Sequence, residues 1–162
     1  MYKVQYAESF SDAAKGTTIA STMYASGVDV IYQAAGGTGT GVFTAAKEVN
    51  EKLDADSDKK VWVIGVDRDQ NAEGNYTSSD KKKSNFVLTS TIKKVGTVVK
   101  DIANGQLKGD KFEGGSTKTY GIKDGGVDIV TSKLPSDIKD AVEKAKEQIK
   151  NGELKPTDGL SK

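Results

Sequence analysis

The chain contains no cysteine and no histidine. Without cysteine it can form no disulfide bond, no zinc–thiolate centre and no thiol nucleophile. Without histidine it also lacks the commonest general base and the commonest metal ligand of proteins. Catalysis would have to rest on carboxylates, lysines or hydroxyl groups, and these form no recognisable catalytic set or metal cluster in the sequence. The two absences therefore favour a binding protein over an enzyme, with no cofactor.

Long apolar runs and an excess of charge are missing too. No apolar stretch approaches the roughly 20 residues that a membrane-spanning helix needs. The opening stretch MYKVQYAESF has neither the basic segment nor the apolar core of a signal peptide, so we expect this chain to lack a signal peptide and a lipid anchor. The net charge of +1, from 24 basic and 23 acidic residues, gives no electrostatic reason to expect nucleic acid as a partner.

Apolar runs alternate with amphipathic stretches in the first part of the chain. Residues 2–6 alternate like a short strand, and residues 28–34 and 61–66 are runs typical of buried strands. Residues 14–26 and 40–53 lie between them and show helical spacing. Crossovers of about 20 residues fit right-handed βαβ units. The pattern predicts an α/β fold with a mostly parallel sheet flanked by helices. In this sheet the strand at residues 61–66 is expected to be buried on both faces.

The second part of the chain is more polar. Residues 67–85 are expected to form a long loop, residues 86–90 a fourth strand, and residues 91–104 an amphipathic helix. Glycine-rich residues 105–130 suggest short strands and turns. Residues 134–152 carry the signals of a final helix, with Pro near its start and Gly at its end.

A glycine-rich turn, AAGGTGTGVF, joins a predicted strand to a predicted helix. A Walker A loop would need Lys and then Ser or Thr where Val42 and Phe43 stand. A dinucleotide fingerprint would need a different glycine spacing after the first strand. Two interpretations remain: a turn whose backbone binds a neutral polar ligand, or a tight strand-to-helix connection that binds nothing.

Two charged residues lie where strands of an open α/β sheet would end. Asp67 follows the most apolar run, and its carboxylate could accept hydrogen bonds from a vicinal diol; alternatively it is solvated or paired with Arg68. Asp69 and Gln70 are expected to be solvated loop residues. Lys93 could donate to a ligand, or could be an ordinary solvated lysine.

Five stretches occur in an order that resembles one known family. The chain is similar to the basic membrane protein (BMP) family of ABC-transporter substrate-binding lipoproteins, the PnrA-like purine-nucleoside receptors. The resemblance covers about Val4 to Gly152. The stretches are VQYAESFSDAAKG, DVIYQAAGGTGTGVFTAAKE, VWVIGVDRDQ, VLTSTIKKVGTVV and YGIKDGGVDI.

The resemblance implies a type I periplasmic-binding-protein-like fold, with two α/β lobes closing on a ligand between them. Family members are longer, and the chain matches only their C-terminal half, so it would be mainly the second lobe, truncated. It implies that residues 1–90 form the core of that lobe, residues 91–115 a segment returning toward the first lobe, and residues 116–162 the C-terminal strands and helix. The apolar stripe of the returning segment would then need another partner, such as a homodimer.

The resemblance also assigns roles to individual residues. Glycine-turn residues would line the ligand through their backbone, the aspartate would hold the ribose hydroxyls, and the lysine would reach the ligand from the hinge side. Phe10 is a weaker candidate for the cleft rim, and Phe43 is expected in the core. The predicted ligand-binding set is Ala35, Gly36, Gly37, Gly41, Asp67 and Lys93.

The function implied is substrate binding for an ABC importer. The ligand would be a purine nucleoside (inosine, guanosine or adenosine), and the partner of the full-length protein would be an ABC permease. The full-length protein would be lipid-anchored at the extracellular face of the cell membrane. The alternatives are an isolated sensory or effector-binding lobe with no transport role, a nucleoside hydrolase, which would need an acidic metal cluster, and a fragment that binds no ligand on its own.

Overall fold

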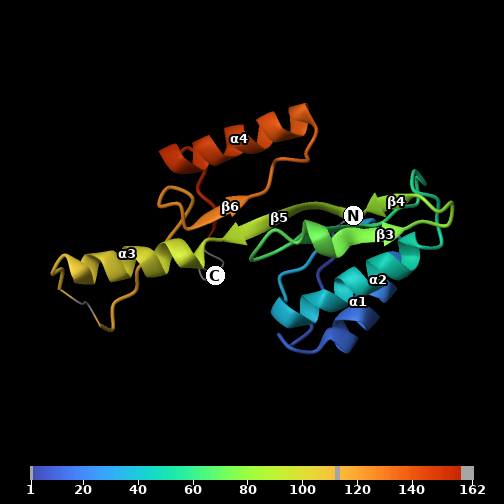
Figure 1. The fold of residues 1–162 in the computed structure, drawn as a ribbon, viewed down its shortest axis with the longest axis horizontal. Coiled ribbons are helices and arrows are strands. Elements are labelled where there is room, and N and C mark those ends of the chain that lie inside the picture. Colours follow the sequence, from blue (N-terminus) through green and yellow to red (C-terminus); the bar gives the residue numbers. More distant parts are fainter. Residues whose placement is uncertain (1, 112–113, 158–162) are drawn as a thin grey trace. The chain divides into compact units, whose positions relative to one another are not determined.

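In the computed structural model, which describes residues 2–111 and 114–157, the chain divides into two units after Thr91 (Figure 1). The first unit holds α1 (Ala13–Ala25), β1 (Val30–Tyr32), η1 (Gly36–Gly39), α2 (Thr40–Asn50), β2 (Trp62–Gly65), η2 (Asn71–Gly74), β3 (Asn75–Thr77) and β4 (Lys83–Asn85). Strand β5 (Val87–Lys93) runs from the first unit into the second, whose other elements are α3 (Val95–Leu107), β6 (Val127–Ile129) and α4 (Ser136–Asn151).

A parallel sheet organises the first unit. Strand β2 pairs in parallel with β1 on one side, where Tyr32 faces Ile64, and with β5 on the other, where Gly65 faces Ser90. Strand β6 follows β5 in the strand order. This arrangement confirms the predicted fold class, because the chain passes from β1 to its parallel neighbour β2 through the helical crossover α2, and α1 precedes β1.

Helices α1 and α2 lie side by side (Figure 1) and enclose the core of the first unit. The side chain of Asp12 caps α1 by accepting from the Lys15 N–H, and Gly27, with φ of +87°, follows its end. The axes come close because Gly41 faces the backbone of α1. The buried apolar core residues are Ala20, Tyr24, Ile31, Val42, Phe43, Ala45, Ala46, Val61, Val63, Tyr76, Phe86 and Val87.

Strand β2 is buried more on one face than on the other. Val63 is fully buried among core residues, whereas Trp62 and Ile64 on the opposite face are only half-buried. The expectation that residues 61–66 are buried on both faces was therefore wrong. A continuous apolar run does not distinguish a strand covered twice from one whose second face is partly open.

Two further expectations for the first unit were wrong. Residues 2–6 form no strand: Tyr2 and Tyr6 are 92% and 82% exposed, because no neighbouring strand pairs with this segment in the described part of the chain. Residues 67–85 are not a structureless loop. They contain η2 and an antiparallel hairpin of β3 and β4, in which Tyr76 packs on Phe86 with ring centroids 5.8 Å apart.

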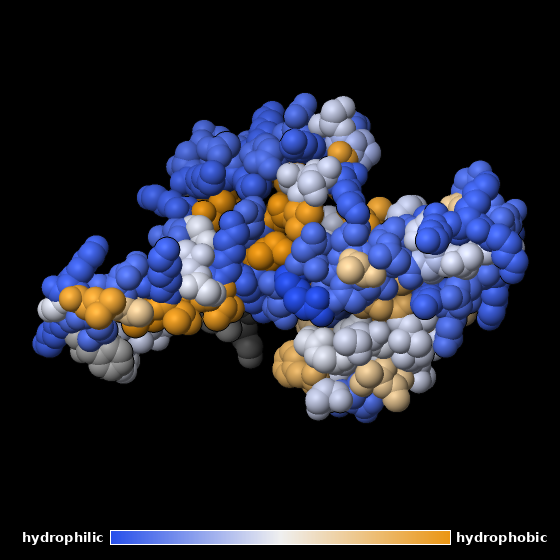
Figure 2. All heavy atoms as spheres, in the orientation of Figure 1, coloured by the Kyte–Doolittle hydropathy of each residue, from blue (hydrophilic) through white to orange (hydrophobic). Residues whose placement is uncertain are grey.

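In the second unit, α3 begins later than predicted because β5 continues through Thr91 and Ile92, which are β-branched and favour strand. The predicted apolar stripe of this helix is exposed: Val95 by 63%, Val99 by 60% and Ile102 by 49%. Figure 2 shows apolar side chains gathered along this helix. The homodimer expected from this stripe stays a prediction.

Helix α4 closes the second unit much as its sequence signals predicted. It follows Pro135 and ends at Gly152, which takes a left-handed conformation with φ of +83°. Within residues 2–111 and 114–157, none of the helices has the length and apolar character needed to cross a membrane.

Replacing Gly41 should disrupt the first unit. A Cβ at this position would overlap the backbone of Ala13 and Thr17, so Gly41→Ala should lower the free energy of unfolding by about 3 kcal/mol or more. The matched control is Gly96→Ala in α3, where a Cβ meets no atom within 4 Å and helix propensity should raise stability by up to about 1 kcal/mol. Urea unfolding followed by circular dichroism measures both. Equal effects of the two changes would contradict the close packing of α1 and α2.

Candidate ligand site

The candidate site lies beyond the carboxyl ends of two neighbouring strands. Strands β1 and β2 are parallel, so their carboxyl ends meet at the same edge of the sheet. The glycine turn follows β1 and Asp67 follows β2. Open α/β sheets place ligands at this edge.

The glycines of the turn divide into two groups by burial. Gly36 and Gly37 are exposed, and Gly36 has φ of +55°, a conformation that favours glycine. Gly39 and Gly41 are buried, and a Cβ on either would overlap Gln33 or α1 respectively. Packing therefore accounts for the second pair, whereas Gly36 and Gly37 present backbone at the surface, next to half-buried Ala35.

Thr38 ties the chain before α1 to the glycine turn. Its buried hydroxyl donates to the Ser9 carbonyl at 2.9 Å and accepts from the Asp12 N–H at 2.9 Å. The Thr38 N–H also donates to the Phe10 carbonyl at 3.2 Å. These bonds hold Phe10 beside Gly36, with its ring 77% exposed. An exposed aromatic face thus borders the turn.

Asp67 occupies an unusual backbone conformation. Its φ is +70°, and the Arg68 N–H donates to the Val66 carbonyl at 2.9 Å across it. A hydrogen bond between residues i+2 and i around a positive φ defines a classic γ-turn, which is rare and strained. Aspartate tolerates positive φ better than most residues. Strain of this kind is concentrated at functional sites.

A buried polar network lies beneath this edge, in the first unit. The carboxamide oxygen of Gln70 accepts from the Val66 N–H at 2.9 Å and from Gln33 Nε2 at 2.8 Å, and the Gln70 N–H donates to Ser90 Oγ at 3.1 Å. Gln33, Gln70 and Ser90 are 4%, 6% and 0% exposed. The expectation that Gln70 is a solvated loop residue was therefore wrong. Sequence reasoning also missed Gln33, although a glutamine within an apolar run is the signal for it.

The orientations of the Gln33 and Gln70 carboxamide groups follow from the Val66 backbone N–H, which can only donate. Because a backbone N–H faces the Gln70 side chain, the facing atom is oxygen, and the Gln33 atom that approaches the same oxygen is nitrogen. Among the described residues, Gln33 Oε1 is then left buried without a hydrogen-bond partner. Such a group costs about 1–3 kcal/mol of stability.

A groove of about 990 Å³ runs beside β1 in the first unit. The extended N-terminal residues form one wall, and α1 and β1 form the other. Of the predicted ligand-binding set, only Ala35 lines it, together with Phe10 and Gln33. The groove therefore borders the glycine turn but does not include Asp67.

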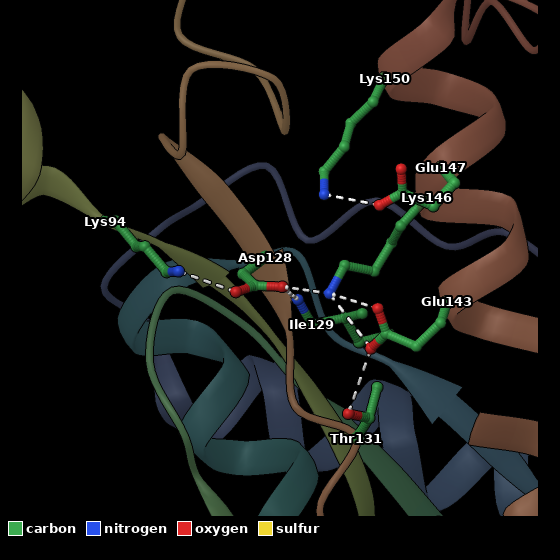
Figure 3. Close-up of polar contacts among 8 residues, drawn as sticks. All are labelled: Lys94, Asp128, Ile129, Thr131, Glu143, Lys146, Glu147 and Lys150. Carbon is green, nitrogen blue, oxygen red and sulfur yellow. Dashed lines mark hydrogen bonds and ion pairs between the residues drawn. The ribbon is translucent and has the colours of Figure 1, made fainter. Parts of the chain in front are cut away.

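Lys93 belongs to the second unit. It is the last residue of β5 and is exposed. The adjacent Lys94 is held by Asp128 at 2.7 Å, and Lys146 binds the other oxygen of the same carboxylate at 3.0 Å (Figure 3). Hydrogen bonds from Lys94 and then Lys146 lower the pKa of Asp128 below its usual range, and the bond to Asp128 raises the pKa of Lys146.

The structure thus places Ala35, Gly36, Gly37 and Asp67 at one sheet edge, Gly41 inside the helix packing, and Lys93 in the other unit. Their ligand contacts stay predictions. In the described ranges, no group of three or more acidic residues could hold a metal ion.

A family model described as ABC transporter substrate-binding protein PnrA-like (Bmp) matches residues 2–157. The chain therefore belongs to this family, whose members are substrate-binding proteins rather than enzymes, as expected from the resemblance.

Curated relatives cover nearly the whole chain. It is 60% identical over 152 residues to the ABC transporter nucleoside-binding protein BmpA of Lactococcus lactis, a match that spans 93% of this chain and 42% of the relative. It is 48% identical to the CD4+ T-cell-stimulating antigen of Listeria monocytogenes, over 94% of this chain and 42% of that protein. The chain thus spans less than half the length of these relatives.

Solved structures agree on the fold. A transcriptional activator of the comK gene from Bacillus halodurans superposes with a TM-score of 0.72 at 23% identity, over 95% of this chain and 48% of that chain. An ABC transporter solute-binding protein from Aeropyrum pernix gives a TM-score of 0.69 at 23% identity, over 97% and 48%. At these identities the likeness concerns the fold alone, and it confirms a partial substrate-binding-protein lobe.

Substitutions at Asp67 should reveal its backbone conformation. Asp67→Asn and Asp67→Gly should leave the free energy of unfolding within about 1 kcal/mol of the original, because both residues accept positive φ. Asp67→Val should lower it by about 1–2 kcal/mol. Urea denaturation followed by the fluorescence of Trp62, the one tryptophan of the chain, measures the effect in the first unit. A neutral Asp67→Val would contradict the γ-turn.

The Asp128 network should stabilise the second unit only while Asp128 is charged. The folded-state pKa lies below the usual value of 3.8, so the contribution is present above about pH 4 and is lost as the pH falls through the folded pKa. Asp128→Asn should therefore lower stability by about 1 kcal/mol at pH 7 and by less at pH 3. Urea denaturation followed by circular dichroism at both values measures this. A difference that is the same at both would exclude the charge as the cause.

Proposed function

We propose that this chain supplies one side of a purine-nucleoside site in a substrate-binding protein of an ABC importer. The observation that carries the proposal is the juxtaposition of exposed glycine backbone and a strained aspartate at the ends of neighbouring parallel strands. The name of the Lactococcus lactis relative supports a nucleoside as ligand. Inosine, guanosine and adenosine are the candidate ligands.

Each group at the edge has a chemical task in this proposal. The Asp67 carboxylate accepts hydrogen bonds from the two ribose hydroxyls, for which its two oxygens are suited. The backbone of Ala35, Gly36 and Gly37 approaches the ligand closely because two of these residues have no side chain. The exposed ring of Phe10 offers an aromatic face to the base.

The remaining groups of the site would come from elsewhere. Lys93 would donate to the ligand, and the other lobe of the whole protein would close over it. The whole protein would be anchored by a lipid at the extracellular face of the membrane and would deliver its ligand to an ABC permease. Because the chain spans 42% of its relatives, these features of the whole protein are part of the proposal.

Asp67→Asn tests the proposed role of the carboxylate without disturbing the turn, since asparagine also tolerates positive φ. Isothermal titration with inosine should show an affinity loss equivalent to about 2–4 kcal/mol. Asp69→Asn is the matched control in the same exposed loop, because an asparagine oxygen can still accept from the Asn71 N–H. It should bind as the original chain does.

The titration has two outcomes that would reject the proposal. Unchanged affinity in Asp67→Asn would reject the ribose contact. Binding of cytidine as tightly as of inosine would reject a purine site. Absence of any binding by the unaltered chain would mean that this half does not hold a nucleoside by itself.

A further inference from the structure

Three buried polar side chains lie under the proposed site without reaching its surface. Gln33 and Gln70 follow β1 and β2, Ser90 lies within β5 opposite the last residue of β2, and each of the three is at least 94% buried. Burying polar groups this deeply costs stability, and Gln33 Oε1, which has no hydrogen-bond partner among the described residues, adds to that cost. A role of this network in positioning the residues of the proposed site above it would explain why the buried polar side chains are present.

Gln70 closes the loop that carries Asp67. Its side-chain oxygen accepts from the Val66 N–H at 2.9 Å. Gln70, three residues after Asp67, is thereby bonded to the residue directly before Asp67. The Gln70 N–H in turn donates to Ser90 on β5 at 3.1 Å. Both ends of the Val66–Gln70 loop are thereby attached to the sheet, and the γ-turn at Asp67 is enclosed between them.

The same oxygen connects this loop to the glycine turn. Gln33, the residue after β1, donates Nε2 to Gln70 Oε1 at 2.8 Å. Gly39 lies against the Gln33 carboxamide so closely that any side chain there would overlap it. One carboxamide oxygen therefore joins the two segments that the proposed nucleoside would touch.

We propose that Gln70 is a positioning residue: by closing the Val66–Gln70 loop and binding Gln33, it holds the Asp67 carboxylate in the conformation and place from which it meets the ribose diol. This role rests on the proposed function for its ligand. Its structural part, the hold on the γ-turn, stands on the hydrogen bonds alone.

The first experiment needs no ligand and compares Gln70→Met with Asn50→Leu. Asn50 is a matched control because it is a fully buried amide that bonds the N–H and the carbonyl of Val61, just before β2, away from the Asp67 loop. Amide hydrogen exchange is followed by NMR at Arg68, whose N–H closes the γ-turn, and at Val63, whose N–H bonds the Phe86 carbonyl. A change in global stability affects both exchange rates alike, so the ratio of the Arg68 rate to the Val63 rate reports only the local change at the γ-turn.

The Arg68-to-Val63 ratio should rise by about tenfold or more in Gln70→Met and stay within about twofold in Asn50→Leu. Equal ratios in the two variants would overturn the proposal. If Gln70→Met does not fold, Ser90→Ala takes its place, because it removes only the acceptor of the Gln70 N–H. It should shift the ratio in the same direction, and no shift would overturn the proposal equally.

The second experiment measures affinities for inosine and 2′,3′-dideoxyinosine. A misplaced Asp67 should weaken inosine alone, so the ratio of the two affinities should fall toward one in Gln70→Met and be kept in Asn50→Leu. A kept ratio in Gln70→Met would overturn the positioning role. If the unaltered chain binds neither compound, this half does not hold a nucleoside by itself, and the exchange experiment alone decides whether Gln70 holds the turn.

Discussion

The carboxamide of Gln70 joins the carboxyl ends of two neighbouring parallel strands, β1 and β2, in the first unit. It accepts from Val66 after β2 and from Gln33 after β1, while the Gln70 backbone donates to Ser90 on β5. With all three side chains buried, these bonds act in a poorly screened environment, where losing one partner leaves others unsatisfied. The position of the glycine turn, the γ-turn at Asp67 and the middle of β5 at Ser90 therefore depend on one another. The edge is built as a unit rather than as separate loops.

The glycines of AAGGTGTG serve two purposes that only the structure separates. Gly39 and Gly41 let Gln33 and α1 approach the chain, while Gly36 and Gly37 leave backbone exposed beside Phe10. Tight packing thus accounts for Gly39 and Gly41, whereas ligand binding by the backbone of Gly36 and Gly37 stays a prediction. Thr38 connects them, because its buried hydroxyl binds the segment that carries Phe10.

Much of the fold could be predicted from the sequence, because its strongest signals are local. Helices α1, α2 and α4 and strands β1, β2 and β5 lie within a few residues of the predicted ranges, since periodicity, Asp12 and Gly152 mark them. Residues 2–6 show that alternation alone does not make a strand, because no strand in the described part of the chain pairs with them. The burial of Gln70 could not be predicted either, because its partners are distant in sequence. The parallel strands predicted from the sequence already placed Asp67 and the glycine turn at one edge of the sheet. The positive φ of Asp67 could not be predicted in this way.

The most direct test of a ligand site at this edge is an NMR titration of ¹⁵N-labelled chain with inosine, because it reports each backbone amide separately. A nucleoside bound at this edge should change the chemical shifts of Gly36, Gly37, Asp67 and Arg68 and leave the β3–β4 hairpin unaffected. Changes confined to the groove beside β1, or no change at these amides at millimolar inosine, would contradict it.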